Sequence, residues 1–162
     1  MKKNLALCTA LTVLGLGAGT ALAGGSEGSL GIGAEYQLSG LGGVSANYDL
    51  GKFHVGGFFG FSDDDGPDNT DFDLGARFYY HLHSTAMSDF GIGGSLGIGV
   101  RDSAGGSATL MFLEPGIQLR AFVVSNVALS FSSGIVLGVV DAAGVGITGQ
   151  FTALGGVHYY FF

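Results

Sequence analysis

The feature that most constrains this chain is a two-residue alternation of apolar with polar or small side chains. In the segment 71–83, the apolar set is Phe72, Leu74, Ala76, Phe78, Tyr80 and Leu82, and the polar or small set is Asp71, Asp73, Gly75, Arg77, Tyr79, His81 and His83. Successive side chains of a β-strand point to opposite faces, so the alternation predicts strands with one apolar face. The fold class predicted is all-β.

Eight segments carry this pattern. They are residues 29–38, 43–50, 53–61, 71–83, 89–101, 107–123, 126–140 and 145–162. The number is even, and most of the segments approach the roughly 9–11 residues that a tilted strand needs to cross a bilayer. Pro115 cannot donate to a strand ladder, so we expect a bulge or a strand boundary there.

The composition narrows the fold further. Charged residues make up 12% of the chain, about half the usual share, and 32 of the 162 residues are glycine. Beyond the first 23 residues, no apolar run is long enough for a transmembrane helix. A chain that is apolar, poor in charge and without such a helix is best accommodated by a closed barrel. We therefore predict an eight-stranded antiparallel up-and-down transmembrane β-barrel.

The first 23 residues have the pattern of an export signal. Lys2 and Lys3 precede an apolar stretch, 5–16, and Ala21-Leu22-Ala23 forms a small-x-small cleavage site. We predict a cleavable helical signal peptide at 1–23 and one barrel domain at 24–162. An uncleaved membrane anchor is the alternative. It is disfavoured because residues 24–27 follow the segment 5–23 directly and include no basic residue to stop transfer. The single cysteine, Cys8, lies within the predicted signal, so no disulfide is expected in the barrel.

The charge balance disfavours one class of partner. The predicted signal holds two of the six basic residues and none of the 13 acidic ones, so residues 24–162 carry four positive and 13 negative charges, a net −9. Nucleic-acid binding needs a basic face. No nucleic-acid partner is expected.

The chain ends in four aromatic residues, 159–162, as a strand in a bilayer with rings at the membrane–water boundary would. With the export signal and the eight alternating segments, this ending resembles the small eight-stranded outer-membrane barrels of the OmpA/OmpX type. The resemblance covers the whole chain after the signal. It implies location in the outer membrane of a Gram-negative cell envelope, with outer-membrane lipid and lipopolysaccharide as surroundings.

In that family, a terminal Phe with hydrophobic residues at alternate positions before it is recognised by the barrel-assembly machinery. The resemblance therefore implies Phe162 and Tyr160 as the assembly signal, although His158 departs from the pattern. The alternation upstream instead predicts Phe161 on the outer face. A bulge at Gly155-Gly156 would reconcile the two registers.

Five charged residues fall on the polar faces of the predicted strands: Glu35, Asp73, Arg77, Glu114 and Arg120. The interior of an eight-stranded barrel is just wide enough to be filled by side chains, and charges there must be paired. We predict an interior polar network that fills the lumen and leaves no continuous large pore. An ion path or a catalytic carboxylate is the alternative.

Two further groups are candidate metal ligands. The acidic loop that follows the third strand places Asp63, Asp65, Asp68 and Asp71 close together, and such carboxylates could surround Ca²⁺ or contact lipopolysaccharide through divalent ions. With both termini in the periplasm, this loop would be extracellular. A solvated loop is the favoured interpretation, since the spacing does not match an EF-hand.

His81 and His83 lie two residues apart and could present two imidazoles to a metal. A polar strand end without metal is favoured, because the sequence suggests no third ligand. No cofactor is expected.

We therefore expect a structural, surface-interaction or adhesion role in the outer membrane, and not an enzyme. A barrel that transports small solutes or hydrophobic compounds is the alternative. A lipid A-modifying hydrolase is less favoured. The pattern Gly-x-Ser-x-Gly occurs at 24–28 and 93–97, but neither match stands at the strand-to-helix turn that a nucleophile elbow needs.

Overall fold

The computed structural model describes residues 26–65, 69–103, 105–150 and 155–161. The predicted signal peptide lies outside the described residues. The strands are β1 (Leu30–Tyr36), β2 (Gly42–Asp49), β3 (Phe53–Asp63), β4 (Thr70–Ser84), β5 (Ser88–Ser103), β6 (Gly106–Val124), β7 (Val127–Val140), β8 (Gly144–Gly149) and β9 (Gly156–Phe161).

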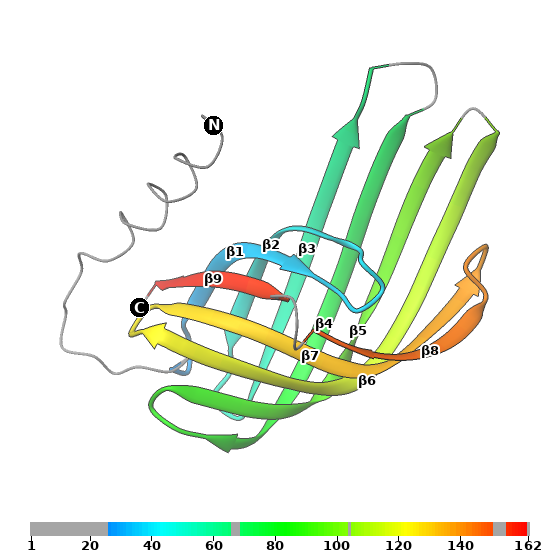
Figure 1. Cartoon of the computed structure of the whole chain (residues 1–162). Coiled ribbons are helices and arrows are strands. Elements are labelled where there is room, and N and C mark those ends of the chain that lie inside the picture. Colours follow the sequence, from blue (N-terminus) through cyan, green and yellow to red (C-terminus); the bar gives the residue numbers. More distant parts are fainter. Residues whose placement is uncertain (1–25, 66–68, 104, 151–154, 162) are drawn as a thin grey trace, which may run out of the picture.

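The strands form a closed antiparallel barrel (Figure 1). From β1 to β8, each strand pairs with the next along the chain, and β9 pairs with both β1 and β7. Because β8 and β9 both pair with β7, they are two parts of one eighth strand. The architecture is an eight-stranded up-and-down barrel, which confirms the predicted all-β barrel fold.

The barrel has an inverted distribution of polarity. Large apolar side chains on its outer face are exposed, among them Ile32, Val44, Phe59, Leu74, Phe78, Leu82, Leu96, Leu113 and Ile135. The buried polar set is Ser29, Glu35, Gln37, Ser45, Asn47, Asp49, His54, Arg77, His81, Asp89, Ser95, Glu114, Gln118, Arg120, Ser130 and His158. Water-soluble domains bury mainly apolar residues, so this barrel reverses their arrangement.

Some aromatic rings lie on the inner face of the barrel. Phe58, Tyr79, Phe122 and Tyr160 are buried in the lumen. Glycine makes room for them: a Cβ at Gly75 would lie 2.2 Å from the ring of Phe58. The lumen therefore holds bulky side chains opposite residues without side chains.

Pro115 corrects one expectation, because it lies inside β6 and marks neither a bulge nor a boundary. It pairs in register with Gly94 on β5. On the other side, the β6–β7 ladder pairs Leu113 with Leu137 and then Gly116 with Gly134, without a register shift. The missing N–H of proline thus costs a local interruption of one ladder and no change of register.

The predicted last strand, 145–162, is interrupted. Gln150 donates its N–H to Ser132, and Gly156 pairs with Ser130, so six residues of the last strand advance while β7 advances by two. The four additional residues are 151–154, which lie outside the described residues, as does Phe162. Because four is an even number, the inward and outward alternation of β8 continues in β9. A single-residue bulge at Gly155-Gly156, as the sequence suggested, would have reversed it.

The phase of β9 follows from this. Phe161 is 53% exposed on the outer face, whereas Tyr160 is fully buried inside the barrel. This is the phase that the upstream alternation predicted, and the role of Tyr160 in an assembly signal stays a prediction.

A bulge also separates the histidines that the alternation placed on one face. In the β4–β5 ladder, His81 pairs with Gly91 but His83 pairs with Phe90, so β4 has one extra residue here. His81 is buried inside the barrel, and His83 is exposed. The two imidazoles cannot share a metal in this arrangement.

The barrel wall is uneven in height. β1 and β2 are short. In Figure 1, the ends of β3–β6 rise beyond the turn that joins β1 to β2. Among the described residues, β8 pairs only with β7, and the part of β3 beyond Phe59 pairs only with β4. We call β8 and Gly60–Asp63 the open edges of the wall.

Candidate functional site

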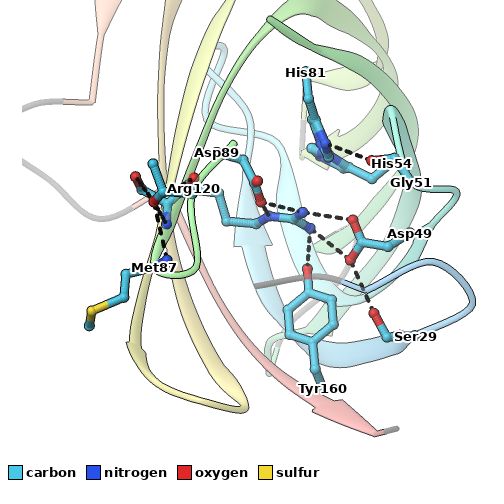
Figure 2. Close-up of polar contacts among 11 residues, drawn as sticks. Ser29, Asp49, Gly51, His54, His81, Met87, Asp89, Arg120 and Tyr160 are labelled. Atoms are coloured by element: carbon cyan, nitrogen blue, oxygen red, sulfur yellow. Dashed lines mark hydrogen bonds and ion pairs between the residues drawn. The ribbon is translucent and has the colours of Figure 1, made fainter. Parts of the chain in front are cut away.

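The end of the barrel with the β2–β3 and β4–β5 turns is called the lower end here. The lower half of the lumen is organised around Arg120 of β6 (Figure 2). Its guanidinium donates to Asp49 of β2 at 2.6 and 2.9 Å, and to Asp89 of β5 at 2.7 and 3.0 Å. Nη1 also donates to the hydroxyl of Tyr160 on β9, at 2.8 Å. Arg120 is 1% exposed. One cation therefore ties together strands on opposite sides of the barrel.

Gly31 on β1 gives the Tyr160 ring its place. We predict that Gly31→Leu lowers the free energy of unfolding by about 1–3 kcal/mol, because its Cβ would lie 2.7 Å from the Tyr160 ring. Gly146→Leu on β8 is the matched control, since no atom lies within 4 Å of a Cβ there. Urea unfolding of the refolded barrel measures both; equal losses would contradict the prediction.

A second ion pair lies higher in the lumen. Arg77 of β4 pairs with Glu35 of β1, and it donates to the side-chain oxygen of Asn47 at 2.8 and 3.2 Å. Ser45 lies 2.6 Å from Nε2 of His158, and a Glu35 oxygen lies 3.7 Å from the same nitrogen. All five side chains are buried.

The contact between Ser45 and His158 bears on the hydrolase alternative. In a serine hydrolase, the acid orients the histidine through the ring nitrogen that does not face the serine. Here Glu35 approaches the same nitrogen, and Nδ1 of His158 has no hydrogen-bond partner among the described residues. The geometry is that of a packed polar cluster and not of a catalytic triad.

The turn between β1 and β2 folds into the lumen. Glu114 on β6 accepts the backbone N–H groups of Leu38 and Ser39 at 2.9 and 2.8 Å, and the hydroxyl of Ser95 at 3.0 Å. The side chain of Gln37 donates to the backbone of β5. Leu41 is 2% exposed inside the barrel. We call residues 37–41 the inward turn.

Beyond the inward turn lies a cavity of about 390 Å³, which we call the outer cavity. Its charged lining is Asp73 and Arg101, 2.6 Å apart, with Asp71 3.7 Å from Arg101. Gly42, at the end of the inward turn, donates its N–H to Asp73. Tyr36 also lines this cavity. The cavity thus lies between the inward turn and the taller part of the wall.

The five residues predicted for the interior polar network fall in four groups of contacts. Glu35 and Arg77 pair with each other, Asp73 belongs to the outer cavity, and Glu114 holds the inward turn. Arg120 is paired with Asp49 and Asp89, which were not among the predicted site residues. The alternation did place both aspartates on polar faces, and this was the signal available for finding them.

The acidic loop lies at the mouth of the barrel. Asp63 and Asp71 belong to the paired strands β3 and β4, Asp65 is exposed, and Asp68 lies outside the described residues. Asp63 accepts a hydrogen bond from Thr70 at 3.4 Å. Asp63 and Asp65 thus face solvent at the hairpin end, whereas Asp71 lines the cavity beside Arg101.

A different set of metal-ligand side chains converges at the lower end of the lumen. Nδ1 of His54 lies 2.7 Å from Nε2 of His81. Ligand atoms of Asp49, His54 and His81 all lie within 4.8 Å of one another, and in the described part of the chain this is the one such group of three. Sequence spacing could not indicate it, because the three residues come from different strands.

Among the described residues, no helix is long and apolar enough to cross a membrane. Comparisons of the chain with protein-family models, with curated proteins and with solved structures found no match.

Proposed function

We propose that this protein is an outer-membrane barrel with an occluded lumen, whose role is structural or one of surface contact, such as adhesion, and is not catalytic. The observation that carries the proposal is the inverted polarity. Exposed apolar side chains cover the outer face, and the polar side chains are buried inside. This distribution suits a barrel whose outer face contacts hydrocarbon.

The occluded lumen distinguishes this role from that of a general pore. The ion pairs of Arg77 and Arg120 fill the lower barrel, and the inward turn crosses it above them. The exposed acidic residues at the β3–β4 end are then available for surface contact or for divalent ions beside lipopolysaccharide. On this proposal, the export signal and the last strand lead the chain to the barrel-assembly machinery.

One experiment tests location and occlusion together. After cell fractionation, the protein should be found in the outer membrane. It should migrate differently in SDS gels before and after boiling, and should give no steady single-channel steps in a planar bilayer. Identical mobility, with the protein in the soluble periplasm, would contradict the membrane assignment. Steady conductance with a shifted mobility would contradict occlusion alone.

A charge on the outer face tests the lipid contact. We expect Ile32→Arg to reduce the stability of the bilayer-folded barrel by about 2–4 kcal/mol, because Ile32 is 52% exposed on the outer face and arginine is costly in hydrocarbon. Met87→Arg is the control: Met87 is 58% exposed, but it lies in the turn before β5 and should tolerate the charge. Denaturant titration in vesicles measures both, and an equal cost at the two positions would argue against a lipid-facing belt.

The open edges favour one second candidate, the passage of small or hydrophobic compounds. They flank the part of the wall beside the outer cavity, where Tyr36 and Phe61 bring apolar surface next to Asp73 and Arg101. Uptake of such compounds into protein-containing vesicles, faster than into empty ones, would support this candidate over the structural role.

A further inference from the structure

We propose that Asp49, His54 and His81 bind a divalent transition metal ion of the Zn²⁺ type inside the lower barrel. The site would join β2, β3 and β4. This inference concerns the barrel itself and does not depend on whether the outer face contacts lipid.

The strand register brings the three side chains together. Asp49 pairs directly with His54 across β2 and β3, and His54 pairs with Tyr79 across β3 and β4. His81 follows two residues later on the same inner face as Tyr79, and its backbone N–H bonds to Lys52 at 2.8 Å. Figure 2 shows the two imidazoles beside Asp49. The convergence is therefore fixed by backbone pairing and not by a mobile loop.

The hydrogen bonds of His81 leave a nitrogen lone pair directed at His54. Nδ1 of His81 lies 3.2 Å from the carbonyl oxygen of Gly51, which can only accept. Nδ1 of His81 therefore carries the proton in the neutral ring, and Nε2 is a free electron pair. Metal-binding histidines commonly donate their second N–H to a backbone carbonyl in this way.

His54 has the complementary arrangement. Its Nε2 has no hydrogen-bond partner among the described residues, although the residue is 2% exposed. The side-chain oxygen of Gln118 is likewise buried without a partner, and both residues line the same small cavity. A small rotation lets Nε2–H of His54 donate to Gln118. Nδ1 then presents a second lone pair toward Nε2 of His81, and a cation between the rings relieves their repulsion.

The local charge favours a cation. Asp49 and Asp89 face the single guanidinium of Arg120, which leaves one excess negative charge in a buried cluster. Oδ2 of Asp49 accepts from Arg120 and from the hydroxyl of Ser29, whereas Oδ1 accepts from Arg120 and retains a further lone pair for a metal. Two imidazoles and one carboxylate are a common protein ligand set for zinc.

Three protein ligands are the number that catalytic zinc sites use, with a fourth position open, but the burial of this site favours a structural role for the ion. The adjoining cavity, lined by Tyr79, Gly91 and Gln118 among others, has no room even for a water-sized molecule as it stands. A substrate could not reach the ion. Binding would instead stabilise the lower ends of three neighbouring strands.

The test is a titration of the folded full chain, purified in detergent after chelation, with Zn²⁺ alone. We expect one Zn²⁺ per barrel, and affinity reduced by at least about 100-fold in His54→Gln and in His81→Gln, since even second-shell changes cost about 10–100-fold. His83→Gln is the matched control. It removes a histidine two residues from His81 on the outer face, and it should bind as the wild type does.

Heat-dependent gel mobility separates loss of binding from loss of folding. Zn²⁺ should raise the temperature at which the wild type and His83→Gln unfold, and should leave that of folded His54→Gln and His81→Gln unchanged. No Zn²⁺ bound by the folded wild type would overturn the proposal and would indicate a proton shared between the rings. Binding that survives both inner substitutions, or that is lost in His83→Gln, would also overturn it.

Discussion

Replacing Arg120 with methionine is expected to lower the free energy of unfolding of the barrel by about 3–5 kcal/mol, because it leaves two buried carboxylates without their cation. Asp49 and Asp89 are 0% and 5% exposed, and their charge-assisted hydrogen bonds come largely from this one guanidinium. Equilibrium unfolding in urea, with the refolded protein in micelles or vesicles, measures the loss.

Two controls make this prediction specific. Arg101→Met removes an arginine whose side chain is 30% exposed at the outer cavity, and should cost about 1 kcal/mol or less. The triple variant Arg120→Met, Asp49→Asn, Asp89→Asn removes all three charges and should recover much of the stability, since an uncompensated charge costs more than a neutral replacement. If the triple variant were less stable than Arg120→Met, the ion pairs themselves would be the source of stability.

Replacing Glu114 with alanine is expected to release the inward turn and open the lumen. Hydrogen bonds to a charged acceptor contribute about 1.5–3 kcal/mol each, and Glu114 accepts three, two of them from the backbone of Leu38 and Ser39. Without Glu114, the backbone N–H groups of the turn lose these acceptors inside the lumen. They can bond to water if the turn moves out. Glu114→Ala should therefore give steady conductance steps in a planar bilayer where the wild type gives none.

Glu114→Gln is the matched control, because its amide keeps an oxygen that can accept from the turn. We expect it to remain closed or to open only briefly. Labelling gives an independent measurement: a thiol introduced as Ser39→Cys should react faster with a membrane-impermeant maleimide in the Glu114→Ala background. A closed Glu114→Ala barrel with an unreactive thiol would mean that the inward turn is held by Gln37 and Leu41 instead.

The alternation predicted the number of strands and the face that most side chains take, because a strand pairs with its neighbour in sequence and the pattern has a period of two. It placed Arg77, Glu114 and Arg120 inside, where they lie. It could not pair them. Arg120 and Asp49 are 71 residues apart and meet across the lumen, and their contact depends on how the barrel closes.

Departures from strict alternation were the other limit. The bulge beyond His81 turns His83 outward, and the inward turn removes Gln37 from the strand that the pattern extended to residue 38. The inward turn is held by its contact with Glu114, and the bulge is a change of register between β4 and β5. A local pattern does not register such contacts, so the sequence indicated His81 and His83 as candidate ligands and missed Asp49 and His54.

The open edges limit how deep the barrel can sit. β8 pairs only with β7, and Gly60–Asp63 pair only with β4. The backbone N–H and C=O groups along their other edge therefore have no strand to pair with among the described residues. Hydrocarbon cannot satisfy such groups, whereas water and lipid headgroups can. In a barrel that spans a membrane, the nonpolar layer must therefore end near the level of the inward turn. The parts of β3–β6 beyond that level then form a sheet on one side of the barrel only, which extends into the headgroup region and the water beyond it.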